Sequence, residues 1–446
     1  MPSFVMQEVA RTRGAAGSSA LGASISAAEL VPRNCTLKPY TKRVVRGIEV
    51  SDQIIAYASP DSTFAVTKRL FDAARRSILI GIYDFNADHA KQLVLAAMRR
   101  GVKVELMLDI DGRSEQELFD ELAGFGAECT PAPSCASKRS RFFRSSHEKV
   151  IVVDNEWSLV QSGNYSANSI PLNVEDGGNP AHFTTGNRDT GLAVRSRRLA
   201  AFFRRILESD IRLQLEGPKG VAALEAVADT FLVEAAPRNI PEQLFPSRTF
   251  ELAKPLTVRP VLSPDNYMRV VPGLLEDARE SILIEQQYIR ATQSEIVRLL
   301  SAIRRARDQR PGLDVRIVLG KIFGGKDLAK ERANLTELES KYGLELGAHI
   351  RYVNTGRLVH CHNKMVLIDG DGVLVSSQNW SNAAVSENRE AGLWLRHHDI
   401  SAYLRSIFES DWKTAVQDPG GRQPESIRAD ALRSGRFIRV MAGDYV

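Results

Sequence analysis

An eight-residue pattern, His-x-Lys-x-x-x-x-Asp, occurs twice in this chain, and this repetition limits what the chain can fold into. The first copy is HEKVIVVD, beginning at His147, and the second is HNKMVLID, beginning at His362. The likeness continues past the octets, because a Ser stands 15 residues and an Asn 17 residues after each His; these are Ser162, Asn164, Ser377 and Asn379. With 8 histidines in the whole chain, chance does not explain so many matched positions.

Shorter repeats on both sides of the motifs indicate that a whole domain is duplicated. Ser-Pro-Asp at 59–61 recurs at 263–265, an offset of 263 − 59 = 204, and residues 206–210 resemble 407–411, an offset of 407 − 206 = 201. The motif histidines are 362 − 147 = 215 apart, so the first half carries an insertion after its motif. We place this insertion at 169–183 and expect it to overhang the cleft as a lid or selectivity loop. We expect a flexible arm at 1–40, domains at 41–216 and 249–446, and a connector at 217–248.

Each half alternates helix-like and strand-like segments, which is typical of an α/β fold. In the first half we expect strands at 77–83 and 102–108 and helices at 64–75, 88–100 and 115–125. The second half repeats this order with strands at 282–288 and 315–319 and helices at 270–280, 295–307 and 330–342. Strands separated by helices predict a largely parallel sheet covered by helices.

Composition excludes some classes of protein. A chain of 446 residues with 43% hydrophobic residues can bury a core in each half. No run of eighteen apolar residues is present, so we expect no transmembrane segment, although peripheral membrane contact fits. The net charge of +5 suits an anionic substrate without choosing between nucleic acid and lipid.

The cysteines and the N-terminus leave the compartment open. Cys129 and Cys135 lie in one loop and can pair in an oxidising compartment, or remain free thiols inside a cell. Cys361 fits a packed position on a buried strand. The N-terminal segment does not resemble a signal peptide, so cytoplasmic is the default expectation.

The motif residues suit phosphodiester chemistry. Side chains alternate along a strand, so His147 and Lys149 project on one face, as do His362 and Lys364. A neutral His can attack phosphorus while a protonated His donates a proton to the leaving oxygen. The two Lys and two Asn side chains can then meet the charge on the phosphate oxygens, and Ser162 and Ser377 can add hydroxyl donors. Asp154 and Asp369 point to the other face, and we expect them to anchor their strands.

This chain resembles the phospholipase D superfamily, whose signature is a duplicated HxKxxxxD motif followed by a GSxN-like segment. The resemblance implies two α/β/α sandwich domains related by a pseudo-twofold axis, with the active site at their interface. It also implies a covalent phosphohistidine intermediate and neither metal nor cofactor. Carried over to this chain, it assigns the chemistry to His147, Lys149, Asn164, His362, Lys364 and Asn379. We expect His147 to attack and His362 to act as the acid.

The same resemblance predicts an acidic residue after each motif that orients a histidine. Asp189 in GNRDTGL and Glu390 in ENREAGL occupy this place, although the sequence does not say which acid serves which His. The chain departs from the family pattern where the Gly of GSxN is replaced by Gln161 and Ser376. These larger side chains put substrate size in question.

The substrate class stays open in the sequence. A basic segment before His147 can follow a nucleic-acid backbone, approach an anionic membrane or form a solvated loop; its cations are Lys138, Arg139, Arg141 and Arg144. By analogy with single-chain relatives, we expect a phospholipase D or phosphatidyltransferase that acts as a monomer. A metal-independent nuclease is the alternative. A cardiolipin-synthase-like function ranks lower because no spanning N-terminal segment is present, and a catalytically silent phosphate- or lipid-binding protein ranks last.

Overall fold

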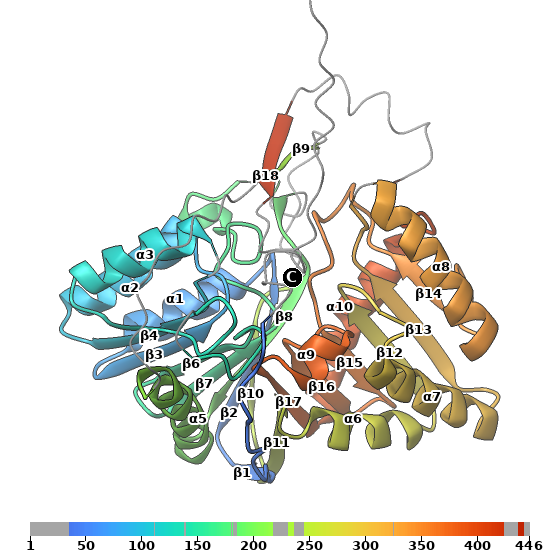
Figure 1. Cartoon of the computed structure of the whole chain (residues 1–446), viewed down its shortest axis with the longest axis horizontal. Helices are drawn as coiled ribbons and strands as arrows, with labels where there is room; N and C mark the ends of the chain where they lie inside the picture. The colour runs from blue at the N-terminus through green and yellow to red at the C-terminus, as the bar shows by residue number, and fades with distance from the viewer. Residues whose placement is uncertain are drawn as a thin grey trace, which may run out of the picture.

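A computed structural model describes residues 35–422, except for 111, 138–139, 180, 182–184, 217–230, 236–244 and 324, together with residues 436–440. Two eight-stranded sheets lie side by side, each covered by helices (Figure 1). The first half runs from blue to green and the second from yellow to red. The expected α/β fold with two similar halves is confirmed.

The first sheet has the strand order β10-β2-β8-β7-β6-β3-β4-β5. Its elements, with their helices, are β2 (Gln53–Ser59), α1 (Thr63–Ala73), β3 (Ser77–Ile82), α2 (Asp88–Arg99), β4 (Lys103–Leu108), α3 (Arg113–Gly124), β5 (Glu128–Pro131), β6 (Lys149–Val153), β7 (Trp157–Gln161), β8 (Asp189–Arg195), α5 (Arg197–Leu215) and β10 (Arg248–Glu251). A short 3-10 helix, η2 (Val174–Asp176), lies in the insertion.

The second sheet repeats this order as β1-β11-β17-β16-β15-β12-β13-β14. Its elements are β1 (Ile48–Val50), β11 (Leu256–Ser263), α6 (Tyr267–Glu276), β12 (Ser281–Gln286), α7 (Ser294–Gln309), β13 (Asp314–Leu319), α8 (Gly325–Tyr342), β14 (Ile350–Tyr352), β15 (Met365–Ile368), β16 (Gly372–Ser376), α9 (Asn382–Ser386), β17 (Glu390–Arg396) and α10 (His398–Thr414). A separate pair, β9 (Phe231–Ala235) and β18 (Arg436–Val440), is antiparallel.

The expectation of largely parallel sheets is wrong. Only β3-β4-β5 and β12-β13-β14 run parallel in the two large sheets, where helices provide the crossover connections. The motif strands instead belong to antiparallel hairpins, β6-β7 and β15-β16. The chain reverses tightly after each motif because Asp154, Asn155 and Asp369 adopt left-handed backbone angles, with φ of 55°, 56° and 58°.

The two halves exchange their edge strands. Strand β1 precedes the first half in the sequence but pairs with β11 of the second sheet, and β10 precedes the second half but pairs with β2 of the first. Each sheet is therefore completed by a segment that lies before the other half in the chain. The sequence-based boundaries at 41 and 249 place both strands in the wrong sheet.

One hydrophobic core joins the halves. It combines the inner faces of both sheets with α5 and α10, through residues such as Phe203, Leu207, Leu404 and Phe408. The outer faces carry separate cores, under α1, α2 and α3 in one half and under α6, α7 and α8 in the other. Since the central core belongs to both halves, they form one continuous body around the segments that carry the motifs.

Several expected segments fall partly or wholly outside the described residues. These include most of the arm at 1–40, much of the connector at 217–248, and both Lys138 and Arg139. The last residues of the arm are anchored, because Cys35 forms a disulfide with Cys135 and the Lys38 N–H donates to Arg141 O at 2.7 Å. Of the two alternatives left open by the sequence, pairing of Cys129 with Cys135 is wrong, and free thiols hold for Cys129 but not for Cys135.

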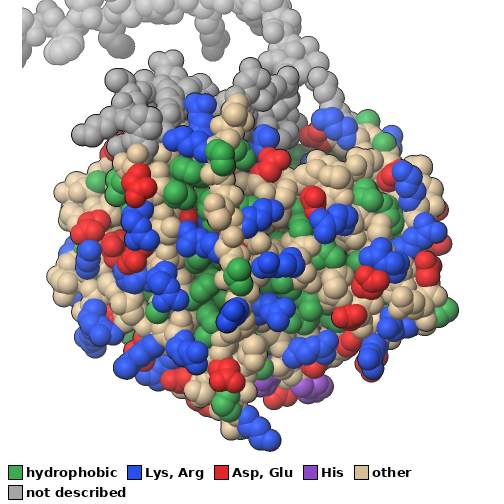
Figure 2. Space-filling view, turned by 60° about the horizontal axis from the view of Figure 1, so that its bottom comes forward, with side chains coloured by type: hydrophobic (Ala, Val, Ile, Leu, Met, Phe, Trp, Pro, Cys, Tyr) green, Lys and Arg blue, Asp and Glu red, His purple; other side chains and the backbone are tan. Residues whose placement is uncertain are grey.

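The two cysteines outside the disulfide differ in their surroundings. Cys129 is a free thiol, and Cys361 is buried as expected. Within the described ranges, no helix has the length and apolar character needed to cross a bilayer. Lys and Arg side chains alternate with acidic ones over the face shown in Figure 2, so the positive charge there is dispersed.

Candidate active site

Short bridges between the halves bring the two motifs together. The residue before each motif pairs with the Asn-Arg-acid segment of the opposite half. The His147 N–H donates to Arg389 O at 2.8 Å, and the His362 N–H donates to Arg188 O at 3.0 Å. Asp189 follows Arg188 directly, and Glu390 follows Arg389. Each bridge therefore places the acid of one half beside the histidine of the other half.

Each motif histidine is held by a carboxylate from the opposite half. His147 Nδ1 lies 2.9 Å from Glu390 Oε2, and His362 Nδ1 lies 2.9 Å from Asp189 Oδ1. All four side chains are buried. Neither histidine Nε2 atom has a hydrogen-bond partner among the described residues. The carboxylates can therefore fix the ring orientation and leave both Nε2 atoms available to a substrate.

The two motif serines contact these acids. Ser162 Oγ donates to Asp189 Oδ1 at 2.8 Å, and Ser377 Oγ donates to Glu390 Oε2 at 2.5 Å. The sequence suggested that these hydroxyls meet the phosphate. In the structure they are instead placed to hold the carboxylates that hold the histidines.

The motif lysines are fully buried next to the histidines. Lys149 Nζ donates to His147 O at 2.7 Å, and Lys364 Nζ donates to His362 O at 2.5 Å. Burial lowers the pKa of Lys149 to about 7, with Glu390 acting in the opposite direction. The motif residues Asn164 and Asn379 are also buried. A bound anion would stabilise the charged form of the Lys149 and Lys364 ammonium groups.

The two histidine–acid pairs differ electrostatically. Burial, together with the charges of Lys149 and Lys364, holds the pKa of His147 well below its usual range. Burial and Lys364 lower the pKa of His362 to about 4, although Asp189 acts to raise it. For His362, the neighbouring carboxylate thus opposes the effect of burial.

The partner acids differ as well. Burial raises the pKa of Glu390 to about 8, against the charge of Lys149. Burial alone would also raise the pKa of Asp189, but the neighbouring His362 and Lys364 outweigh it and lower that pKa. At neutral pH, Asp189 is thus ionised whereas Glu390 favours its protonated form.

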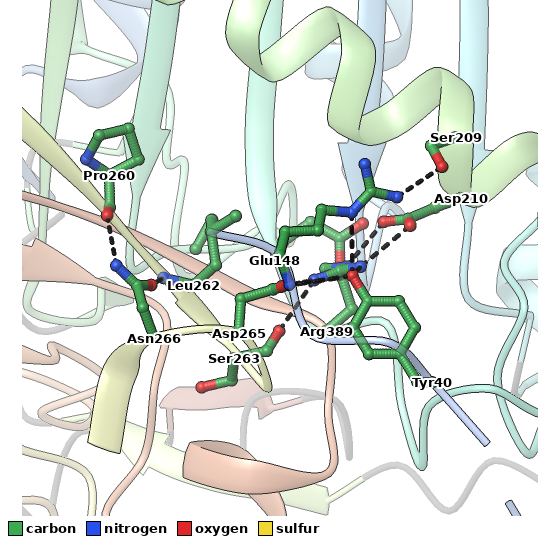
Figure 3. Close-up of polar contacts among 12 residues, drawn as sticks. Tyr40, Glu148, Ser209, Asp210, Pro260, Leu262, Ser263, Asp265, Asn266 and Arg389 are labelled. Atoms are coloured by element: carbon green, nitrogen blue, oxygen red, sulfur yellow. Dashed lines mark hydrogen bonds and ion pairs between the residues drawn. The ribbon is translucent and has the colours of Figure 1, made fainter. Parts of the chain in front are cut away.

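Each partner acid is preceded by a buried arginine that is itself held by buried aspartates. Arg389 Nε lies 2.7 Å from Asp210 Oδ2 on α5, and Nη1 lies 2.6 Å from Asp265 Oδ2 (Figure 3). The Tyr40 hydroxyl lies 2.8 Å from Arg389 Nη2. The guanidinium also stacks on Phe143, 4.2 Å from the ring centroid. This cluster ties the segment that carries Glu390 to the first half.

The other half has the equivalent arrangement around Arg188. Its Nε lies 2.6 Å from Asp411 Oδ2 on α10, and Nη1 lies 2.6 Å from Ser59 O. We did not single out these arginines from the sequence. The sequence did contain a signal for them. Both arginines lie in the repeated Asn-Arg-acid segment, and their Asp partners lie in the repeated Ser-Pro-Asp and Glu-Ser-Asp segments.

The motif aspartates anchor the backbone at the end of each motif strand. Asp154 accepts the backbone N–H groups of Arg75, Arg76 and Ser77 at 2.7–2.9 Å. Asp369 does the same for residues 279–281. Both lie at the opposite end of their strand from the histidine. This geometry fits the structural role expected from the sequence.

The basic segment before His147 is held by the protein. Arg144 Nε lies 2.6 Å from Glu387 Oε2 of the second half, and Phe143 is buried. The Arg141 main chain contacts residue 38, as described above. Of the expected substrate-approach residues, Arg144 thus joins the two halves, and Lys138 and Arg139 lie outside the described residues.

The two residues that replace the Gly of GSxN form hydrogen bonds within their own halves. Gln161 Oε1 accepts from the Tyr57 hydroxyl at 2.9 Å on the outer-core side, and Ser376 Oγ donates to Lys364 O at 3.0 Å. In the insertion, Ile170 is buried and its carbonyl lies 2.5 Å from His89 Nε2. The lid remains a prediction. No group of three or more His, Cys, Asp or Glu side chains that could hold a metal occurs in the described part of the chain.

Comparisons with known proteins identify relatives. A family described as "Cardiolipin synthase, PLD-like domain" matches residues 67–211 and 273–412, which is more than half of the chain. Cardiolipin synthase B from Escherichia coli O6:H1 (strain CFT073) is 25% identical over 363 residues, covering 76% of this chain and 75% of that protein. These matches correct the low rank that the sequence gave to a cardiolipin-synthase-like function.

Two solved structures share the fold. Phosphatidylserine synthase from Haemophilus influenzae Rd KW20 has a TM-score of 0.53 at 13% identity, covering 87% of this chain and 96% of that one. Polyphosphate kinase from Porphyromonas gingivalis has a TM-score of 0.51 at 12% identity, covering 85% and 55%. At these identities, the likeness supports the fold alone.

Proposed function

The chain belongs to the phospholipase D-like family of cardiolipin synthases, and on this basis we propose that it transfers phosphatidyl groups from a phospholipid to an alcohol or to water. The observation that carries the proposal is the pair of buried imidazoles. Each is held through Nδ1 by a carboxylate of the opposite half, and each has an Nε2 atom without a partner among the described residues. Two such nitrogens at one site supply both nucleophilic attack and proton transfer.

In the first step, His147 Nε2 attacks the phosphorus of the phospholipid. A bond forms between nitrogen and phosphorus while the bond from phosphorus to the headgroup oxygen breaks. Protonated His362 gives its Nε2 proton to that oxygen, which leaves as an alcohol. Lys149 and Lys364 stabilise the charge on the other phosphate oxygens.

In the second step, an alcohol or water attacks the phosphohistidine. The acceptor hydroxyl gives its proton to His362 as its oxygen bonds to phosphorus. The bond from His147 Nε2 to phosphorus breaks, and its electron pair returns to the ring. The products are a new phosphodiester, or phosphatidic acid when water is the acceptor, and the resting enzyme. The protein needs no metal for either step.

The division of roles between the histidines is supported by their surroundings. His362 faces the ionised Asp189, which stabilises an imidazolium. His147 faces Glu390, whose carboxyl favours the neutral form, and the pKa of His147 is lowered by burial and two lysines. A neutral nucleophile at His147 fits its environment. Burial and Lys364 lower the pKa of His362 to about 4, so His362 takes up its proton when the bound phosphate offsets the charge of the lysines, and Asp189 then stabilises the imidazolium.

A lipid substrate is favoured over nucleic acid by two observations. The family match and the relative are named for cardiolipin synthase, a lipid enzyme. In addition, Arg144 of the basic segment is occupied by Glu387, which removes one cation from a path for a nucleic-acid strand. A nuclease activity is therefore an outcome of the test below and not a second proposal.

The test measures product release in excess EDTA from phosphatidylcholine/phosphatidylglycerol vesicles and, in parallel, from single-stranded DNA. His147→Asn and His362→Asn should each abolish headgroup release. His398→Asn is the matched control, because His398 is exposed on α10 and should leave the rate unchanged. Enzyme quenched in denaturant at alkaline pH, where the N–P bond of a phosphohistidine survives, should carry the phosphoryl label on His147.

Three outcomes would overturn parts of this proposal. Cleavage of DNA without headgroup release would make the protein a nuclease. Loss of all activity in EDTA that a divalent cation restores would refute the metal-independent mechanism. Label found on His362 alone would reverse the roles of the histidines.

A further inference from the structure

Residues 35–43, which we call the strap, connect the two halves of the protein before the chain enters β1. At one end, Cys35 forms the disulfide with Cys135 of the first half. At the other end, the Arg43 backbone N–H donates to Asp265 Oδ1 of the second half at 2.6 Å. The strap therefore lies across the boundary at which the candidate active site is assembled.

Tyr40 lies in the middle of the strap and forms three hydrogen bonds through its hydroxyl group. The oxygen accepts from Arg389 Nη2 at 2.8 Å and from Arg43 Nε at 3.1 Å. The hydroxyl donates to Asp265 Oδ1 at 3.1 Å (Figure 3). A phenolic hydroxyl both donates and accepts, so Tyr40 binds the cation of Arg389 and the carboxylate of Asp265 at the same time.

The ring of Tyr40 packs against both segments of the bridge that holds His147. Its centroid lies 5.1 Å from that of the buried Phe143 ring, with the rings edge to face. The Arg389 guanidinium carbon also lies 5.1 Å from the Tyr40 centroid. Phe143 stands four residues before His147, and Arg389 O accepts the His147 N–H. Tyr40 thus contacts each side of this bridge.

The same bridge sets the position of the carboxyl partner of His147. Glu390 follows Arg389 directly, and its Oε2 lies 2.9 Å from His147 Nδ1. A shift of Arg389 would therefore move both the backbone that pairs with His147 and the carboxyl group that orients its ring. Misplacing a reacting group by about 1 Å can slow a reaction about a hundredfold. The contacts that hold Arg389 thus matter for the rate.

The equivalent place beside the other histidine is occupied by Phe245. Its ring centroid lies 5.2 Å from the Arg188 guanidinium carbon. The offset of 245 − 40 = 205 is close to the offset of 204 between the Ser-Pro-Asp repeats. Phe245 has an aromatic ring like that of Tyr40 but no hydroxyl. The hydrogen bonds from Tyr40 are therefore specific to the side that carries His147.

The carboxylates beside the two arginines differ in the same sense. Asp265 Oδ2 lies 2.6 Å from Arg389 Nη1. The equivalent Asp61 Oδ2 lies 3.5 Å from Arg188 Nη1. The ion pair is thus closer on the side where the strap binds the aspartate. The duplicated site is symmetric in its motif residues but not in the contacts that hold its arginines.

The disulfide fixes the strap next to the first motif. Cys135 is buried, and its N–H donates at 3.3 Å to the carbonyl of Arg144, three residues before His147. Tyr40 is five residues from Cys35, so it stays within about 18 Å of this fixed point. A cross-link restricts the undocked strap, so less conformational entropy is lost when Tyr40 docks.

We propose that Tyr40 is a positioning residue for His147 and that the Cys35–Cys135 disulfide keeps it docked, so that the rate of lipid cleavage depends on the oxidised disulfide. The proposal rests on the transfer reaction proposed above, in which His147 is the nucleophile. A dithiol reductant gives two electrons and two protons to the disulfide; the S–S bond breaks, both cysteines become thiols, and the reductant becomes a disulfide. The strap is then held by its non-covalent contacts alone, and Tyr40 spends less time on Arg389.

The first test removes the hydroxyl, with headgroup release from phosphatidylcholine/phosphatidylglycerol vesicles as the assay. Tyr40→Phe should lower kcat about tenfold and leave the KM for lipid within about twofold, because a hydrogen bond to a charged group is lost while the cleft is unchanged. The phosphoryl label should appear on His147 more slowly by the same factor. Tyr352→Phe is the matched control. It removes a hydroxyl that donates to the buried Glu331 at 2.7 Å on the edge strand β14, so it should lower stability but leave kcat per folded molecule unchanged.

The second test opens the disulfide in the full-length protein. Cys35→Ser should lower kcat about as much as Tyr40→Phe, and the double variant should be slower than either by no more than about twofold, because both changes act through one contact. Dithiothreitol should bring the parent to the kcat of Cys35→Ser, with two more free thiols per chain in a thiol titration, and reoxidation should restore the rate. Cys129→Ser changes a free thiol and should match the parent, including its response to the reductant.

The outcomes separate this inference from the proposed function. Parent values of kcat in both Tyr40→Phe and Cys35→Ser, with normal headgroup release by the parent, would overturn the inference alone. A fall in kcat that Tyr352→Phe shares would mean that Tyr40 only stabilises the fold. Slowing by Tyr40→Phe without any effect of Cys35→Ser or of the reductant would refute the role of the disulfide. No headgroup release by the parent would overturn the proposed function itself.

Discussion

The two partner acids should respond differently to loss of charge, although they hold equivalent histidines. Asp189→Asn removes an ionised carboxylate 2.9 Å from His362. Opposite charges about 4 Å apart attract by about 4 kcal/mol at an effective dielectric constant of about 20, and each ~1.4 kcal/mol corresponds to a factor of about ten in rate. Asp189→Asn should therefore slow headgroup release by about a thousandfold at pH 7.

Glu390→Gln should have a smaller effect at the same pH. Burial raises the pKa of Glu390 to about 8, so at pH 7 the substitution exchanges one neutral side chain for another of similar shape. We expect a loss of about tenfold or less at pH 7. Above about pH 8 the parent enzyme gains a carboxylate that supports His147, and the amide of the variant cannot ionise in the same way, so the ratio of the two rates should widen.

The assay is headgroup release from vesicles in EDTA between pH 5.5 and 9.5, for the parent, both single variants and the exposed-histidine control His398→Asn. Folding of each variant is checked by its unfolding midpoint. Equal losses in the two variants at pH 7 would refute the argument, as would a Glu390→Gln ratio that is constant across the pH range.

Three further substitutions test the supporting contacts. Arg389→Met should lower the free energy of unfolding by about 3–5 kcal/mol, because Asp210 and Asp265 would stay buried without their cation; a loss below about 1 kcal/mol in denaturant unfolding would contradict this. Asp154→Ala should cost about 1–3 kcal/mol by removing a backbone acceptor, yet kcat per folded molecule should be unchanged, and a fall in that kcat would indicate a catalytic role. Glu148→Gln should stabilise the protein more at pH 8 than at pH 5. Burial raises the pKa of Glu148 to about 8, so the folded state holds a proton that the unfolded chain releases above about pH 4.3, and the parent loses stability as pH rises through this window. Equal melting shifts at both pH values would count against this reading.

The repeated motifs made much of the candidate site predictable. His147, Lys149, His362 and Lys364 are identified by local patterns, and their same-face placement follows from strand geometry. The order of helices and strands was predictable for the same reason, since hydrophobic periodicity is a local property.

Long-range pairing was not predictable. Glu390 lies 243 residues from His147 and Asp189 lies 173 residues from His362, and either acid could have served either histidine from the sequence alone. The antiparallel direction of β6 and β7 depends on a turn at Asp154 and Asn155 that β-propensity does not reveal. The disulfide from Cys35 to Cys135 closes 100 residues, and nothing near either cysteine signals its partner.

The exchanged edge strands have a consequence for synthesis of the chain. When the first motif has left the ribosome, the first sheet still lacks β10, and His147 lacks the carboxylate that arrives with Glu390. A nascent or truncated polypeptide is therefore not expected to contain an assembled site. A chain that stops before Glu390 would leave His147 without its carboxyl partner, so the first motif depends on residues that are made 243 positions later.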